Sequence, residues 1–267
     1  MESNISTEQQ LYLNEIKKTS WMIKVYQIGI LVSIVLFWEL LATFKIIDAF
    51  IFSQPSRILK SLIEMISNGN IFKHVGITVF ETVIGFTTST IIGTLIATLL
   101  WWNNFINKVC EPYLVVFNSL PKTALAPILI VWLGNNMTSI IATALLTSVF
   151  VTVLNVLAGF MEVSKEKIKL IYTFGGTKKQ VLTKVVFPAS IPVIINALKV
   201  NVGLSFVGVI VGEFLVSKAG LGYLITYGSQ IFKLDWVMLS VIILGFLSAL
   251  LYKLIIILEK RISKWWE

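Results

Sequence analysis

Long apolar runs recur along this chain, and they leave few folds open to it. Apolar side chains make up 56% of the 267 residues, which is more than an ordinary soluble domain carries. Each run is long enough to cross the roughly 30 Å hydrocarbon core of a bilayer as a helix. The sequence therefore predicts an all-α integral membrane protein with about six transmembrane helices, at about residues 25–45, 77–102, 110–133, 138–161, 191–216 and 237–258.

The third of these spans is the most interrupted one, since it contains Pro121, Lys122 and Pro127. Proline removes a backbone hydrogen bond and breaks or kinks a helix. No soluble domain remains outside the spans. We therefore expect a tail at residues 1–24, one membrane domain at 25–260 and a second tail at 261–267.

The basic residues predict how the spans are oriented. If the amino terminus is inside, thirteen lysines and arginines fall in the inner segments and tails, and five fall in the outer ones. Cytoplasmic loops of membrane proteins carry this kind of excess. The pattern thus places both termini and the lysine-rich segment around residues 162–190 in the cytoplasm. It also accounts for most of the net charge of +8 without nucleic-acid binding.

That lysine-rich segment predicts two short helices joined by a glycine turn. Ser164 is a candidate N-cap of the first helix, with Glu166 in its first turn. Thr177 followed by Gln180 is typical of a capping box that begins the second helix. We expect the remaining positions to give an apolar side at Ile168, Ile171 and Phe174, a break at Gly175 and Gly176, and an end of the second helix at Pro188.

The segment resembles the EAA loop of the permeases of binding-protein-dependent ABC importers of type I. The glycine and prolines of that pattern fall on Gly175, Pro188 and Pro192, while Lys169, Leu170 and Ile171 stand where the family has Glu-Ala-Ala. The segment from Leu120 to Gly134 is similar to one that precedes the fourth span in sulfonate, nitrate and taurine permeases. The two segments Gly212-Glu213-Phe214 and Gly220-Leu221-Gly222-Tyr223 are similar to the end of that family's fifth span.

This resemblance implies a type I ABC importer permease fold in a bacterial inner or plasma membrane. It implies no catalytic residues and no cofactor on this chain, with ATP and Mg²⁺ held by two separate P-loop ATPase subunits. The implied docking residues are Lys169, Leu170, Ile171, Phe174, Gly175, Gly176, Thr177, Gln180 and Pro188. Further implied partners are an extracytoplasmic solute-binding protein or lipoprotein, membrane lipid and a second permease, either another copy of this chain or a different one.

The resemblance implies a small organic anion as the solute, such as a sulfonate, taurine or nitrate. Related permeases carry thiamine precursors or riboflavin, which stay open as alternatives. Pro121, Lys122 and Glu213 are the candidate residues of the translocation path, because charged groups in a span lie toward protein or water. Lys122 has a structural alternative, an ion pair with Glu213 or Glu39. The glycines of Gly208-x-x-x-Gly212 indicate close helix packing.

Enzyme motifs are missing from the chain. It contains no G-x-x-x-x-G-K-[ST] phosphate loop, and its single histidine, His74, excludes a His-rich metal site. An ion-coupled secondary transporter and an assembly subunit without transport remain as rival functions. On the outer side, residues 52–76 predict an amphipathic helix capped by Ser56, which either braces the fold or contacts the binding protein. The loop 217–236 is a second candidate for that contact.

Overall fold

The computed structural model describes residues 7–263, and within that range all regular structure is helical. Five helices are long and apolar enough to span a membrane, and a sharply bent pair of helices makes a sixth candidate span. The predicted all-α fold class is thereby confirmed, with five of the predicted spans formed by single long helices and the third formed by the bent pair. The candidate spans are Leu11–Thr43, Asn70–Trp102, the pair Asn104–Ser119 and Lys122–Leu133, Met137–Glu162, Lys178–Val216 and Leu234–Arg261.

The chain divides into two units at residues 63 and 64, each of which is described by itself. The first unit contains α1, Thr7–Thr43, the short α2, Ala49–Phe52, and most of α3, Pro55–Ser67. Residues 7–24, expected to be a tail, are part of the α1 helix. The remaining tail residues, 1–6 and 264–267, lie outside the described range.

The amphipathic α3 helix forms, but Ser56 is not its cap. Proline at the first helical position suits the fixed φ of that residue, so α3 begins at Pro55. The Ser56 backbone N–H donates to Glu39 Oε2 at 3.0 Å. A carboxylate at the end of α1 therefore satisfies an orphan donor of α3, which local sequence could not reveal because 17 residues separate the two.

The core of the second unit is formed by α4, Asn70–Trp102, α7, Met137–Glu162, and α10, Phe187–Val216, which pack against one another in all three pairings. The close packing predicted for Gly208 and Gly212 is confirmed. A Cβ atom at Gly212 would lie 3.0 Å from the Cα atom of Ile140 on α7, and one at Gly208 would meet the backbone of Ala144. Small residues let helices in a membrane approach closely.

A buried polar cluster ties the same three helices together. The Asn201 side-chain amide on α10 donates to Thr90 Oγ1 on α4 at 2.8 Å and to Thr152 Oγ1 on α7 at 2.7 Å. All three side chains are buried. Interhelical hydrogen bonds of this kind contribute about 0.6–2 kcal/mol each inside a membrane, because no water competes for the donors.

The third predicted span is broken where the prolines indicated. Helix α5, Asn104–Ser119, is followed by the 3₁₀ turn η1, Lys122–Leu125, and by α6, Ala126–Leu133. The two parts are bent by 87°. Pro121 begins η1 and Pro127 occupies the first turn of α6, where a missing N–H is tolerated.

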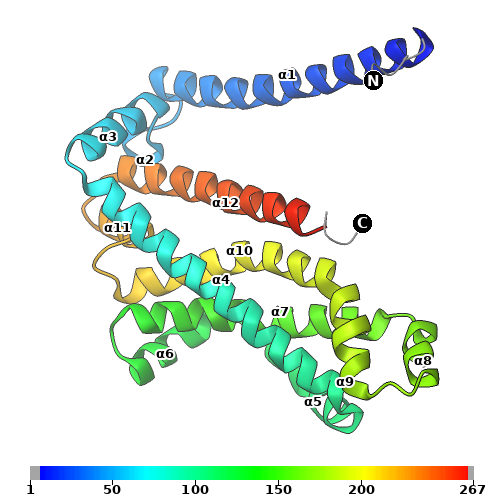
Figure 1. Cartoon of the computed structure of the whole chain (residues 1–267). Coiled ribbons are helices and arrows are strands. Elements are labelled where there is room, and N and C mark those ends of the chain that lie inside the picture. The colour runs from blue at the N-terminus through cyan, green and yellow to red at the C-terminus, as the bar shows by residue number, and fades with distance from the viewer. Residues whose placement is uncertain (1–6, 264–267) are drawn as a thin grey trace. The chain divides into compact units, whose positions relative to one another are not determined.

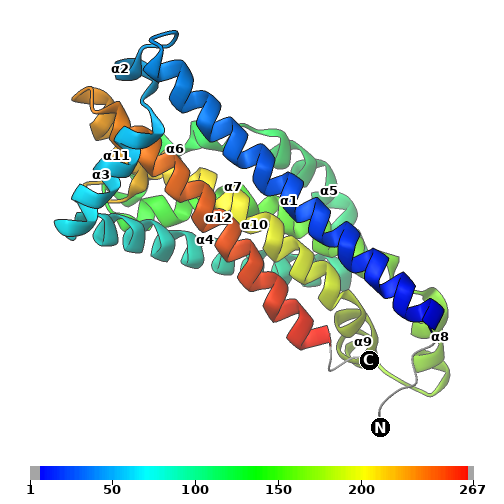
Figure 2. The same cartoon turned by 90° about the horizontal axis from the view of Figure 1, so that it is seen from above.

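The remaining helices of the second unit are α8, Lys165–Thr173, α9, Lys178–Val181, the π-helical turn η2, Leu182–Val186, α11, Leu221–Gln230, and α12, Leu234–Ser263. Helices α8 and α9 lie at one end of α10 and α11 lies at the other, as Figures 1 and 2 show from two directions. The two candidate sites described next therefore occupy opposite ends of this unit.

Candidate functional sites at the two ends of the helical bundle

The first helix of the lysine-rich segment begins as predicted. Ser164 is its N-cap, and its Oγ accepts a hydrogen bond from the Lys167 backbone N–H at 3.4 Å. The same hydroxyl donates to Glu166 Oε2 at 2.5 Å, and this hydrogen bond holds the pKa of the Glu166 carboxyl below its usual range. Glu166 therefore keeps its negative charge beside the helix N-terminus, where the helix dipole favours it.

The turn between the two helices is a Schellman motif. Gly175 has φ +73°, its N–H donates to the Tyr172 carbonyl, and the Gly176 N–H donates to the Ile171 carbonyl, both at 2.9 Å. These two hydrogen bonds close the last turn of α8 and require a left-handed residue at the first glycine. The predicted break at Gly175 and Gly176 is confirmed.

The second helix starts with the predicted capping box but does not end at Pro188. The Thr177 N–H donates to Gln180 Oε1 at 2.7 Å, and the Gln180 N–H donates to Thr177 Oγ1 at 3.3 Å. From there the helix runs through η2 into α10, and the prediction of an end at Pro188 is wrong. The Phe187 N–H donates to the carbonyl of Leu182, five residues back, so the widened π turn lies where a proline would otherwise disrupt an α-helix.

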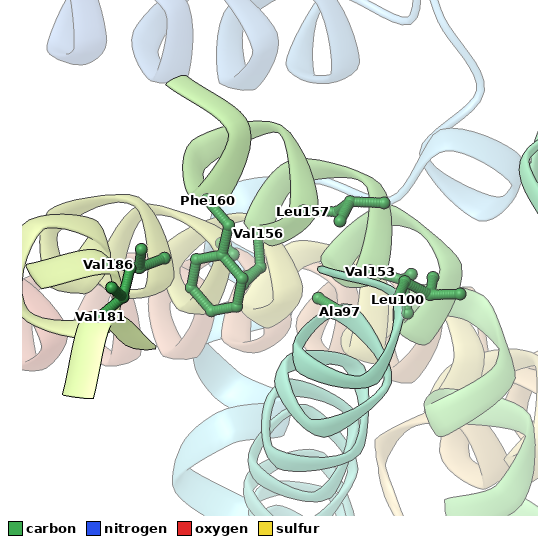
Figure 3. Close-up of a cluster of buried hydrophobic side chains, with 9 residues drawn as sticks. Ala97, Leu100, Val153, Val156, Leu157, Phe160, Val181 and Val186 are labelled. Atoms are coloured by element: carbon green, nitrogen blue, oxygen red, sulfur yellow. The ribbon is translucent and has the colours of Figure 1, made fainter. Parts of the chain in front are cut away.

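The two helices are anchored to the bundle. Val181 and Val186 are buried in an apolar cluster with Val156 and Phe160 of α7 and Ala97 of α4 (Figure 3). Ile168 and Ile171 of α8 pack against the same cluster, as their predicted apolar side requires. A displacement of α8 or α9 would therefore be transmitted directly to α4, α7 and α10.

Lys178 adds a polar anchor that the sequence analysis missed. Its Nζ donates to the Trp102 carbonyl at 2.6 Å and lies 5.7 Å and 5.5 Å from the ring centres of Trp101 and Trp102. The ammonium thus satisfies a free carbonyl at the end of α4 and gains from cation–π attraction. The two adjacent tryptophans were the only signal for it.

Large apolar side chains stay exposed on this otherwise polar, lysine-rich element. Phe174 is 80% exposed, Leu170 54% and Tyr172 48%. Phe174 is thus not packed on the apolar side with Ile168 and Ile171, because it is the C-cap of α8 and lies at the turn. Lys169, Thr177 and Gln180 are also exposed. Exposed apolar groups gathered on a well-ordered polar element are typical of a protein contact site.

At the break in the third span, Lys122 stabilises the end of a helix. Its Nζ donates to the Asn118 carbonyl at 2.5 Å, and the side chain is half-buried. A lysine near a helix C-terminus satisfies a carbonyl that has no partner within the helix. Among the described residues no ion pair joins Lys122 to Glu213, so the first of the two ion pairs predicted for Lys122 is not formed.

At the other end of the bundle, Glu213 holds the start of α11. Its side chain is 1% exposed. Oε1 accepts from the Thr78 hydroxyl at 2.6 Å and Oε2 accepts from the Gly222 backbone N–H. Thr78 Oγ1 in turn accepts from the Leu221 N–H at 2.8 Å. A carboxylate is a strong partner for the free N–H groups of a helix N-terminus.

His74 takes part in the same junction. Its Nδ1 accepts from the Gly220 N–H at 3.0 Å, and its ring stacks on Tyr223 with the centroids 5.9 Å apart. The two sequence motifs Gly-Glu-Phe and Gly-Leu-Gly-Tyr thus meet in space with α4. In the described residues, no group of three histidine, cysteine or acidic side chains has the arrangement of a metal site.

A small cavity adjoins this junction. It measures about 290 Å³, and its largely apolar lining also includes the polar residues Glu81, Asn135, Ser217 and Lys218. The Glu81 side chain is buried, and its Oε2 has no hydrogen-bond partner among the described residues. A buried polar atom without a partner is costly, so this oxygen is an unsatisfied acceptor beside the cavity.

Comparison with known proteins identifies the family. Residues 89–267 match the family described as the binding-protein-dependent transport system inner membrane component. The chain belongs to this family and is a multi-pass membrane permease of the ABC importer class. The fold described above and the predicted EAA-loop resemblance agree with that assignment.

The relatives of this chain are named for different solutes. The chain is 29% identical to the formylaminopyrimidine transport permease protein ThiX of Halalkalibacterium halodurans, over 85% of this chain and 90% of that protein. It is 24% identical to the putative aliphatic sulfonates transport permease protein SsuC of Bacillus subtilis, over 93% and 89%. It is 26% identical to the riboflavin transport system permease protein RibX of Chloroflexus aurantiacus, over 88% of each chain.

Solved structures share the fold at low sequence identity. An amino acid ABC transporter with histidines is similar with a TM-score of 0.59 and 17% identity, over 75% of this chain and 97% of that one. The MetNI methionine ABC transporter, in an inward-facing conformation, is similar with a TM-score of 0.55 and 16% identity, over 68% and 94%.

Proposed function

We propose that this chain forms the translocation path of an ATP-driven importer for a small organic anion, such as a sulfonate, taurine or nitrate. An extracytoplasmic binding protein delivers the solute, and a second copy of this chain completes the path. The 24% identity to a sulfonate permease supports the solute class, as does the Lys122 ammonium at the break of the third span. A thiamine precursor is the second candidate solute, favoured by the 29% identity to the formylaminopyrimidine permease.

The exposure of Phe174 is the main observation that supports the proposed ATP-driven mechanism. This side chain projects from a turn that two capped helices and two hydrogen bonds hold in place. A rigid apolar projection can enter a pocket on a partner at little entropic cost. We assign that pocket to an ATPase subunit, which binds the ATP and Mg²⁺ that this chain has no phosphate loop to hold.

The anchoring of α8 and α9 suggests how the ATPase drives transport. Closure of two ATPase subunits on ATP would push on the turn around Phe174 in each permease copy. The push reaches α7 and α10 through the buried Val181 and Val186, and α4 through Lys178. The bundle then rocks between outward-open and inward-open states, with the lysine-rich segment and both termini in the cytoplasm.

Co-purification tests the docking site. The tagged chain, extracted from its native membrane in mild detergent, is expected to bring a P-loop ATPase with it in stoichiometric amount. Phe174→Ser should abolish this without affecting membrane insertion. Phe72→Ser is the matched control, because Phe72 is 66% exposed and lies at the start of α4, the end opposite to Trp102. Equal ATPase recovery with both variants would refute docking through Phe174.

Two further measurements test the transport cycle and its solute. Uptake into cells must stop when ATP is depleted with the proton gradient clamped, whereas an ion-coupled transporter would continue. The binding protein that co-purifies with the complex is then tested against sulfonates, taurine, nitrate, formylaminopyrimidine and riboflavin by thermal shift. Stabilisation by an anion of the first group supports the proposed solute, and stabilisation by formylaminopyrimidine alone would replace it with the thiamine precursor.

A further inference from the structure

We propose that the groove between the docking helix α8 and the adjoining ends of α10 and α12 binds one anionic phospholipid. The groove measures about 570 Å³, within the range of specific ligand sites and well above the volume of a side chain. Its walls are largely apolar and come from α8 and from the first turns of α10. They include Leu170, Ile171, Pro188, Ala189, Ile191 and Ile195.

The charged groups at the groove favour an anion. Three charged side chains line it, namely Lys167, Lys184 and Glu259. Glu259 already forms an ion pair with Lys199 of α10, at 2.7 Å between Nζ and Oε2. In the part of the chain that the structure describes, neither Lys167 nor Lys184 has an ion-pair partner. The groove therefore presents two uncompensated positive charges beside an apolar surface.

The position of the groove favours a lipid over a soluble anion. It lies where two candidate spans, Lys178–Val216 and Leu234–Arg261, reach their lysine-rich ends. This is the level of the phospholipid head groups, where basic pockets between transmembrane helices bind anionic lipids. A free phosphate would use the two lysines but not the apolar walls. A neutral acyl chain would use the walls but not the lysines, so an anionic phospholipid is the ligand that uses both.

Such a lipid would join the docking helix to the bundle. Lys167 belongs to α8, Lys184 to η2, and the apolar walls continue along the first turns of α10. A head group held between the two lysines would restrain α8 relative to α10, in addition to the protein contacts already described. The inference concerns the permease itself and does not depend on the identity of the solute.

The test measures lipid retained by the full-length chain and by its assembled importer complex. Both are purified in mild detergent from bilayers of phosphatidylcholine with added phosphatidylglycerol, and retained lipid is quantified by mass spectrometry. We expect one phosphatidylglycerol per permease, selected over phosphatidylcholine. The double variant Lys167→Gln/Lys184→Gln should bind it about 30-fold more weakly, as expected for two lysines that attract an anionic head group.

Two variants complete the test. Lys165→Gln/Lys179→Gln removes the same charge from two exposed lysines of α8 and α9 that do not line the groove. This control should retain phosphatidylglycerol at the wild-type level. Ala189→Trp fills the groove without changing charge, and it should lose the lipid while eluting as a monodisperse protein. Equal retention of phosphatidylcholine, equal loss in the control, or binding by the isolated chain but not by the complex would each overturn the proposal, the last by showing that the ATPase fills the groove.

Discussion

The carboxylate of Glu213 occupies the space that a Cβ atom on Gly220 would need. Gly220 has φ +120°, a conformation that glycine adopts freely and other residues rarely do. The close approach lets Glu213 reach the first N–H groups of α11 while Thr78 and His74 bind the adjoining backbone. Two motifs separated in the sequence are therefore parts of one junction between α4, α10 and α11.

This relationship predicts that Gly220→Ala is destabilising by about 2 kcal/mol or more, from backbone strain and displacement of a buried carboxylate. The measurement is the thermal stability of the detergent-solubilised protein. Gly203→Ala is the control, since a Cβ there meets no atom within 4 Å and alanine favours a helix. Its stability should stay the same or rise. A comparable loss in both variants would mean that the junction is not the cause.

Removal of the carboxylate should also be costly. Glu213→Ala leaves the Gly222 N–H and the Thr78 hydroxyl without their buried acceptor, and each unpaired group costs about 1–3 kcal/mol. We expect a clear drop in thermal stability, against no measurable change for the exposed Glu111→Ala. If Glu213→Ala were as stable as wild type but inactive in uptake, its role would be in the translocation path instead.

Substitutions at Gly175 should act only through the backbone conformation that they impose on the turn. A Cβ there meets no atom within 4 Å, so a substitution causes no steric clash and is opposed only by backbone strain at φ +73°. The Gly175→Val variant should insert normally, but the ATPase subunits of its complex should hydrolyse ATP without transport. A β-branched residue costs about 1–3 kcal/mol in this backbone region and shifts the turn. Gly175→Asn should retain most of the activity, since asparagine tolerates the left-handed conformation. Full transport by the valine variant would contradict a coupling role for the turn.

Two roles of Lys122, attraction of an anionic solute and hydrogen bonding at the end of α5, can be separated by removing its charge. Gln at this position can still donate to the Asn118 carbonyl, whereas Ala cannot. If the positive charge attracts an anionic solute, both Lys122→Gln and Lys122→Ala should slow uptake by about tenfold or more, as loss of electrostatic focusing predicts. Initial uptake rates in proteoliposomes, corrected for the folded protein, provide the measurement. Normal uptake by Lys122→Gln would leave only the structural role at the end of α5.

Lys178 should matter more than the lysine beside it. Lys178→Ala removes the hydrogen bond to Trp102 and the contacts with both indole rings, at a cost of about 1–2 kcal/mol. Lys179→Ala, at an exposed neighbouring position, should cost little. We expect weaker coupling of ATP hydrolysis to uptake in the first variant only. Identical coupling ratios in both would exclude Lys178 as a link to α4.

Features with local causes were predictable from the sequence. The capping box at Thr177 and Gln180, the cap at Ser164 and the break at Gly175 each involve residues within a few positions of one another. The end of the second helix at Pro188 was wrongly predicted although it is also local. A π turn places the proline in a continuous helix, and no pattern in the sequence indicates such a turn.

The sequence by itself determined that the protein is an all-α membrane protein with a capped, lysine-rich segment, because apolar length acts through the bilayer and capping patterns act through neighbouring residues. Only the tertiary structure decided which distant groups satisfy one another. Glu213 accepts a hydrogen bond from the start of α11 and does not pair with Lys122. The side chain that caps the start of α3 is Glu39 and not the predicted Ser56. Lys178 donates to the end of α4. Buried hydrogen-bonding groups must find partners, but the partner is selected by proximity in the folded chain, which sequence spacing does not specify.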